Sequence, residues 1–264
     1  MLQRTRTNLH GRSRAESSEG EMLRSLKDFR GYKIHATDGN IGKVHDFFFD
    51  DEFWILRYVV VDTGHWLPGR KVLLTPGVMC DPDWRQRAFN VALTREQVRS
   101  SPDVDTDQPV SRQHEIHLHE HYGWPFYWAP SGDLVGPIMA TPALEPSPPT
   151  KPGDPHLRSV RDIIGYDVEA SDGEIGCVDD FIADTGNWTV RYLVVAIRKW
   201  LPGRKVLISP QWLVGPISWT AVTVKIIMSR ESIKQSPIYD ATAPVNREYE
   251  GQLYDFYGRP RYWS

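Results

Sequence analysis

The clearest candidate for chemistry in the sequence is a run of imidazole and carboxylate side chains. The segment "HEIHLHEH" contains four histidines and two glutamates, namely His114, Glu115, His117, His119, Glu120 and His121. Clustered imidazoles and carboxylates can bind zinc or nickel. If the segment is helical, however, its alternating spacing distributes the ring nitrogens around the helix axis. We therefore favour a solvated helix face over a metal site.

Two pairs of aspartates form a second candidate. Asp46 and Asp50, like Asp180 and Asp184, would share one face of a regular β-strand. Paired carboxylates can act as general acid and base, but that role needs a nucleophile or a cleft that shifts their pKa values. The sequence shows neither, so we favour turn and capping roles. It also lacks a glycine-rich phosphate loop, a nucleophile elbow and zinc-ribbon spacing, so we expect no enzyme activity, metal or cofactor.

A third candidate is a turn that combines an aromatic ring with positive charge. The octet "WLPGRKVL" occurs twice, and its aromatic and basic residues are Trp66, Arg70, Lys71, Trp200, Arg204 and Lys205. Tryptophan and arginine are favoured interface residues, so these six are our candidates for binding an anionic or peptide partner. The alternative is that each tryptophan covers one end of the fold while the cations stay solvated. Pro68-Gly69 predicts a type II turn within the octet.

Two aromatic segments pose a similar choice. "YGWPFYW" and "YGRPRYW" end at Trp128 and Trp263. Each could form a ligand cage or a plug over its own domain. We favour the plug, because aromatic side chains chiefly contribute buried area.

An internal repeat positions all of these candidates. A shift of 134 residues aligns residues 23–76 with residues 157–210 without a gap, and about half of the positions are identical. After a slip of one residue the match continues into the two aromatic segments. Such self-similarity indicates two copies of one structural unit. The second copy replaces the four histidines with residues that are not usual metal ligands, namely Tyr249, Gln252, Tyr254 and Phe256.

The repeat predicts four segments. The first domain spans residues 22–128 and the second residues 156–264; we call these the first and second repeats. Residues 129–155 between them are rich in proline and predict an extended linker. Residues 1–21 are polar and predict a disordered N-terminal extension.

Local signals predict short strands followed by helices. Asp38-Gly39 lies between two β-rich runs and is typical of a hairpin, and residues 55–62 form an apolar run that suits a central strand. Many short strands close together favour a small barrel. Thr94 and Ser229 resemble N-caps of a short helix. A second helix is expected at residues 112–122, capped by Ser111 and followed by Gly123, and its counterpart is bounded by Asn246 and Gly258.

Composition narrows the functional classes. The net charge of -3 provides no overall positive field, which disfavours a general nucleic-acid binder. Cys80 and Cys177 have no close partner in the sequence, which suits a reducing compartment, and we expect each to be a small buried hydrophobe. No segment approaches the roughly 20 apolar residues of a membrane span. We therefore expect a cytoplasmic protein without membrane insertion.

These residues resemble the PRC-barrel family, the small β-barrel shared by the cytoplasmic domain of the photosynthetic reaction centre H subunit and a ribosome maturation factor. The motifs that carry the resemblance, each with a counterpart 134 residues later, are Gly31-Tyr32, Asp38-Gly39-x-Ile41-Gly42-x-Val44-x-Asp46, Asp50, Trp54, Arg57-Tyr58-x-Val60-Val61 and the octet from Trp66 to Leu73. The resemblance implies a mainly β protein of two tandem small β-barrels, each followed by short C-terminal helices.

The function that we expect is that of a non-enzymatic protein-interaction or scaffold module. Its two barrels would form a pseudo-symmetric pair that presents loops to a protein partner and could dimerise further. The alternative is a ribosome- or RNA-associated factor, which would use a local basic patch such as Arg198-Lys199 with Arg204-Lys205.

Overall fold

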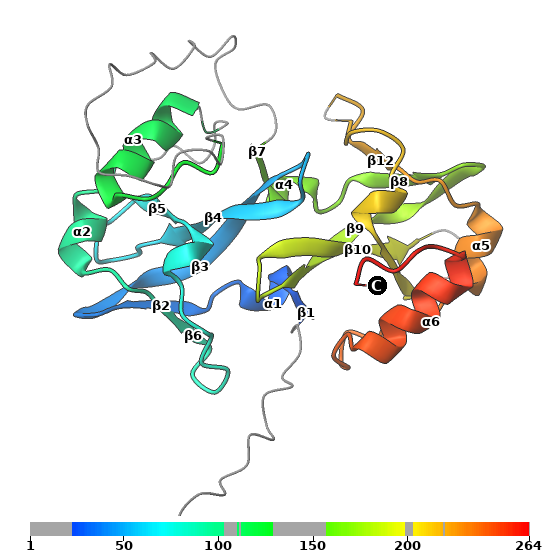
Figure 1. Cartoon of the computed structure of the whole chain (residues 1–264), viewed down its shortest axis with the longest axis horizontal. Helices are drawn as coiled ribbons and strands as arrows, with labels where there is room; N and C mark the ends of the chain where they lie inside the picture. The colour runs from blue at the N-terminus through cyan, green and yellow to red at the C-terminus, as the bar shows by residue number, and fades with distance from the viewer. Residues whose placement is uncertain are drawn as a thin grey trace, which may run out of the picture.

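The computed structural model describes residues 23–102, 110, 112–128, 157–198, 203–218 and 220–263. The predictions for the extension, the linker, Ser111 and Trp200 concern residues outside these ranges. The fold is mainly β with a few short helices, as the sequence predicts, and its sheet is curled. Figure 1 shows the two repeats side by side, with α3 over the outer end of the first and α6 over the second.

Both repeats build the same elements in the same order. The first repeat contains β1 (Leu23–Ser25), α1 (Leu26–Phe29), β2 (Lys33–Ala36), β3 (Gly39–Asp50), β4 (Ile55–Asp62), β5 (Lys71–Leu74), the 3-10 helix η1 (Pro76–Val78), β6 (Ala88–Asn90), α2 (Arg95–Arg99) and α3 (Arg112–Tyr122). The second contains β7 (Leu157–Ser159), α4 (Val160–Ile163), β8 (Asp167–Ala170), β9 (Gly173–Asp184), β10 (Thr189–Ile197), β11 (Lys205–Ile208), η2 (Pro210–Trp212), β12 (Thr223–Lys225), α5 (Arg230–Gln235) and α6 (Arg247–Tyr257).

The local sequence signals act as expected. The hairpin predicted at Asp38-Gly39 joins β2 to β3, with Ala36 paired to Gly39. Thr94 caps α2 by accepting a hydrogen bond from the amide of Gln97, within a capping box. Asn246 caps α6 in the same way, and Gly258 ends it in the left-handed conformation. The structure confirms these signals. Each depends only on backbone geometry within a few residues, which is why the sequence alone could predict it.

The glycines of the repeated Ile-Gly motif allow two strands to approach closely. A Cβ atom on Gly42 would collide with the backbone carbonyl of Asp62, and one on Gly176 with that of Ala196. The motif is therefore architectural.

The strands of both repeats belong to one sheet. Among the described strands the order is β12-β8-β9-β10-β4-β3-β2-β6, with β5 on β4 and β11 on β10. The two repeats join where Thr189 of β10 pairs with Ile55 of β4. These two positions are equivalent in the repeat, so the junction has the character of a local two-fold axis.

The first strand of each repeat pairs with the other repeat. β1 is antiparallel to β9, with Ser25 opposite Ile182, and β7 is antiparallel to β3, with Ser159 opposite Phe48. Figure 1 shows β1 with α1 and β7 with α4 in the middle of the molecule. Each repeat therefore completes its neighbour's sheet through backbone hydrogen bonds.

One large hydrophobic cluster runs through both repeats. The ring of Trp188, from the β9–β10 turn, lies 6.4 Å from that of Phe29 and 6.2 Å from that of Phe89, both in the first repeat. Phe49 and Phe181 also meet across the junction, 5.5 Å apart. Separating the repeats would expose this apolar surface to water.

The prediction for the cysteines is half right. Cys177 is buried in β9, but Cys80 is exposed. Cys80 directly follows Met79, which packs against the core, and successive side chains of an extended segment point to opposite sides. Among the described helices, none is long and apolar enough to cross a membrane.

Candidate functional sites

The first copy of the repeated turn has the predicted geometry. Gly69 has a φ of 76°, and the amide of Arg70 donates to the carbonyl of Leu67 over 3.1 Å. These are the features of a type II turn closed by its usual hydrogen bond. Pro68 and Gly69 are exposed at its tip.

The arginine of each turn binds its own repeat. Arg70 donates to the backbone carbonyls of Arg99, over 2.6 Å, and of Ser101, which end α2. Arg204 makes the equivalent hydrogen bond to the carbonyl of Ser236 after α5. A cation at the C-terminus of a helix satisfies carbonyls that lack an intrahelical donor. Both guanidinium groups are therefore held in place and are not freely solvated.

Trp66 lies among positive charges at this corner. It is half-buried, and the guanidinium of Arg95 lies 4.8 Å from its ring centre, with that of Arg99 at 6.0 Å. Such distances allow cation–π attraction. Glu96 balances part of this positive charge through a 3.2 Å ion pair with Arg99. The corner formed by Trp66, Arg95 and Arg99 is thus an aromatic surface with positive charge, and we call it the tryptophan corner.

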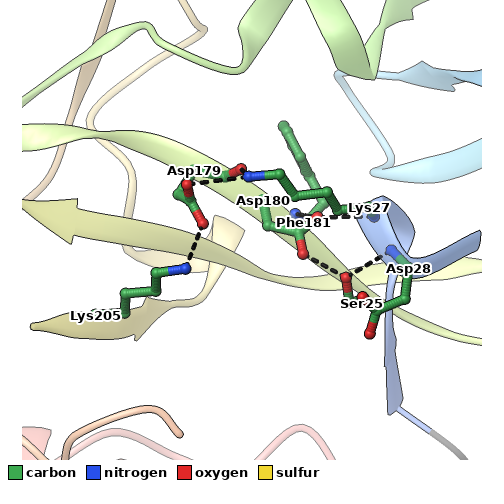
Figure 2. A network of polar contacts seen from close by, with 7 residues as sticks. All are labelled: Ser25, Lys27, Asp28, Asp179, Asp180, Phe181 and Lys205. Atoms are coloured by element: carbon green, nitrogen blue, oxygen red, sulfur yellow. Dashed lines mark hydrogen bonds and ion pairs between the residues drawn. The ribbon is translucent and has the colours of Figure 1, made fainter. Parts of the chain in front are cut away.

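The lysines of the two turns differ in their surroundings. Lys205 forms an ion pair of 2.9 Å with Asp179, which Lys27 of the first repeat also contacts at 3.2 Å (Figure 2). At the equivalent position to Asp179 the first repeat has His45. Burial, Lys71 and Arg161 all lower the pKa of His45. The ring nitrogen Nε2 of His45 lies 2.5 Å from Nη1 of Arg161, which requires a neutral imidazole to accept the hydrogen bond.

Asp46 and Asp180 fasten the exchanged strands. The hydroxyl of Ser25 donates to Asp180 over 2.5 Å, and the amide of Lys27 donates to its other oxygen over 3.1 Å, as Figure 2 shows. Ser159 and the amide of Arg161 contact Asp46 in the same way, at 2.6 and 3.2 Å.

Each serine is also the N-cap of the short helix that follows it. Burial raises the pKa of Asp46 and of Asp180, although these hydrogen bonds oppose the shift. We call each Ser–Asp contact, with its backbone hydrogen bond, a clasp. The sequence did not predict the clasps, because they join residues from different repeats.

Asp50 and Asp184 have the structural role that the sequence favoured. Asp50 accepts hydrogen bonds from the amides of Glu52 and Phe53 and forms a 3.0 Å ion pair with Arg57. Asp184 pairs with Arg191 at 3.2 Å. These aspartates close the tight turns that join β3 to β4 and β9 to β10.

The helix of the histidine cluster does not present a uniformly solvated face. Glu115 is 0% exposed and His119 is 4% exposed, whereas His117 is exposed. The prediction of a solvated face is therefore wrong for Glu115 and His119. Four residues apart, they lie on the side of α3 that packs against β4. Within the described part of the chain, no three His, Cys, Asp or Glu side chains are grouped so that they could hold a metal ion.

Glu115 is the centre of a buried polar cluster. It accepts hydrogen bonds from the hydroxyls of Tyr58, over 2.9 Å, and Tyr127, over 2.8 Å, and pairs with Arg112 at 2.9 Å. Burial raises the pKa of both tyrosines, and the neighbouring carboxylate adds to the shift. Both hydroxyls are therefore neutral donors at physiological pH.

The ring of His119 connects this cluster to the segment that follows α3. Its Nδ1 lies 2.9 Å from the carbonyl of Pro125, so this nitrogen carries a proton, and its Nε2 lies 2.8 Å from the hydroxyl of Tyr58. Burial lowers the pKa of His119. Nε2 of the neutral ring is then an acceptor, and the single hydroxyl proton of Tyr58 is donated either to Nε2 or to Glu115, one at a time.

The second repeat builds the same cluster without a histidine. Glu250 accepts hydrogen bonds from Tyr192 over 2.7 Å and Tyr262 over 2.8 Å, and it pairs with Arg247 at 3.0 Å. Tyr127 and Tyr262 thus attach the aromatic segments to their own repeats, as a plug requires of these two side chains. The signal in the sequence was that the tyrosines, glutamates and arginines recur in both copies while the histidines do not.

A pocket of about 520 Å³ opens at the junction of the repeats. Its walls include Val78 of η1, His119 of α3, Trp124 and Tyr127 from the segment after α3, Arg57 of β4, and Trp188 from the second repeat. This volume lies within the range of roughly 300–1,000 Å³ that is typical of small-molecule sites. The sequence did not predict this pocket, because elements of both repeats form it.

Comparison with known proteins identifies part of this architecture. Residues 155–230 match the model of the PRC-barrel domain, so the chain contains a PRC-barrel domain, as the sequence motifs predicted. A search of curated proteins gives no match.

Proposed function

We propose that the chain is a non-enzymatic interaction module made of two tandem PRC barrels that act as one unit. The first barrel corresponds to the first repeat, which shares the motifs and the strand order of the second. The module presents the tryptophan corner to a protein partner. The observation that carries this proposal is the reciprocal exchange of β1 and β7.

The exchange supports a scaffold role because it limits motion between the repeats. Backbone pairing, two clasps and a shared hydrophobic cluster all cross the junction. The chain itself would therefore lose little conformational freedom when a partner contacts both repeats. Preorganisation of this kind increases affinity without additional contacts.

The charge of the tryptophan corner suggests the chemistry of the partner. Arg95 and Arg99 flank the ring of Trp66, and a partly exposed ring with two cations suits an acidic peptide that carries an apolar side chain. The partner that we propose is therefore a protein with an acidic segment. Nucleic acid remains the alternative, because its phosphates could contact the same cations.

The setting of the two cysteines suits the cytoplasm. Cys80 is exposed and both cysteines are free. An exposed thiol is more readily kept reduced inside the cell than outside it. We include a reducing compartment in the proposal on this ground.

An affinity pull-down from the native host tests this function. The bait is the full chain, compared with a Trp66→Ala/Trp200→Ala variant and with a Phe53→Ala control. Phe53 is an exposed aromatic away from the corner, with 60% of its surface accessible. We expect a protein partner that the wild type and the control retain and the double variant loses.

Two results would count against the proposal. Equal recovery of the partner by all three baits would show that the tryptophan corner does not take part in the interaction. Recovery of ribosomal components that wash off steeply with salt would favour the RNA-associated alternative.

A further inference from the structure

The two repeats differ in what fills the space beside their 3-10 helices. Val78 ends η1 and Trp212 ends η2. Their carbonyls accept equivalent hydrogen bonds, from Ala92 and Ile227, each over 3.1 Å. The two residues are therefore structural counterparts. Because the first repeat has Val78 where the second has Trp212, it lacks an indole ring at this position.

In the second repeat the indole of Trp212 is part of the core. It is 2% exposed, and its ring lies 5.1 Å from that of Tyr254 and 5.0 Å from that of Tyr257. In the first repeat the junction pocket of about 520 Å³ lies against Val78. Beside its 3-10 helix, the second repeat thus has the buried ring of Trp212, whereas the first repeat has an open pocket beside Val78.

Trp124 compensates for only part of this difference. Its ring lies 5.7 Å from that of His119 and 4.2 Å from that of Tyr122, the counterparts of Tyr254 and Tyr257. It therefore replaces the contacts that Trp212 makes with the helix. The pocket remains open between Trp124, Val78 and Trp188. The second repeat has the exposed Arg259 at the position of Trp124.

The walls of the pocket indicate what it would bind. The rings of Trp124, Tyr127 and Trp188 line it, and aromatic rings favour a planar aromatic guest through stacked or edge contacts. The nearest charges are balanced, because Arg57 pairs with Asp50 at 3.0 Å and Arg112 pairs with Glu115 at 2.9 Å. An anion would gain no net attraction from these pairs and would lose its hydration, and a cation would meet the guanidinium of Arg57, which already lies 3.9 Å from the ring centre of Tyr127.

We propose that the junction pocket binds a small, uncharged, planar aromatic molecule about the size of an indole ring. The guest lies against Val78 and beside Trp124, with the rings of both repeats around it. Because the pocket lies between the repeats, binding also links them further. This ligand site is separate from the tryptophan corner, so the inference goes beyond the proposed interaction with a protein.

Calorimetric titration of the full chain with indole tests the proposal. We expect saturable binding of one equivalent to the wild type and loss of that binding in Val78→Trp, whose new side chain fills the pocket. Trp212→Val opens the matching space in the second repeat and is expected to bind an additional equivalent. Cyclohexanol, which is of similar size but is not planar, is expected to bind much more weakly than indole.

Two further measurements guard against a variant that fails to fold. Val78→Trp/Trp124→Arg reproduces the residue pair of the second repeat and is expected to fold and to lose binding. In the wild-type protein, NMR of the histidine rings is expected to show a saturable shift for His119 on addition of indole and none for the exposed His117.

The proposal is wrong if the wild type shows no saturable binding. It is also overturned if a folded, filled variant binds indole as well as the wild type does, if cyclohexanol binds equally well, or if the resonances of His119 and His117 respond alike.

Discussion

At the scale of single residues, the two repeats keep the same polar scaffold but vary one member of it. Glu115 and Glu250 each bind two tyrosines and one arginine. His119 stands where the second repeat has Tyr254. Only the first repeat's cluster therefore contains an imidazole, and burial lowers the pKa of that imidazole.

The first prediction is that His119 makes the stability of the protein depend on pH. Burial lowers its pKa from the ordinary value of 6.5. As the pH falls below this value the unfolded chain binds a proton that the folded chain does not, so the free energy of unfolding falls. The contribution is fully present above pH 6.5 and is lost as the pH falls through the lower pKa of the folded state.

Denaturant unfolding at about pH 7 and about pH 5 measures this effect. The groups that face the His119 ring or its hydrogen-bonding partner are Tyr58, Glu115, Tyr127 and Arg112. We expect His119→Tyr to reduce the loss of stability between the two values, and His117→Gln to leave it unchanged. His45, whose pKa is also lowered, accounts for a remaining part. An unchanged pH dependence in His119→Tyr would show that this ring does not titrate as described.

At the scale of elements, the sequence alone did not predict which strands β1 and β7 pair with. The hairpins, the caps of α2, α5 and α6 and the type II turn at Pro68-Gly69 follow from residues next to one another, and the structure confirms them. The exchange of β1 and β7 cannot be read in this way, because residues 23–25 and 157–159 have the same sequence, Leu-Arg-Ser. Either segment could pair in either repeat by local preference. The choice depends on contacts that cross the chain, such as Ser25 with Asp180.

The buried face of α3 shows a related limit. The spacing of the histidines correctly indicated that their rings point in different directions, but not which of them points inward. Which side chains of α3 point inward depends on its packing against β4, where the hydroxyl of Tyr58 contacts both Glu115 and His119. Comparison of the two repeats would have identified Glu115, since its tyrosine and arginine partners recur in both copies.

The second prediction concerns the clasps. Asp180→Ala leaves the hydroxyl of Ser25 and the amide of Lys27 without their acceptor, so we expect it to lower the free energy of unfolding by about 1–3 kcal/mol. Ser25→Ala removes the same contact and the N-cap of α1, and the double variant should cost less than the sum of the two. Asp162→Ala, in the first turn of α4 but with a side chain outside the clasp, is the control. Strict additivity of Ser25→Ala and Asp180→Ala would show that the pair does not interact.

At the scale of the whole molecule, the two repeats behave as an interlocked pair. Two copies of a unit exchange their first strands, share a sheet through Ile55 and Thr189 and share one hydrophobic cluster. The arrangement resembles a strand-exchanged homodimer whose subunits are joined in one chain. It creates the junction pocket, whose walls come from both repeats.

The most direct test of this account is to cut the chain between the repeats. A protease site inserted within residues 129–155 of the full-length protein allows cleavage after folding, and size-exclusion chromatography with light scattering at low concentration then gives the mass. We expect both fragments to elute together at the mass of the intact chain, and to separate more readily in an Asp46→Ala/Asp180→Ala variant. Elution of the wild-type fragments as two independent folded monomers would contradict the account.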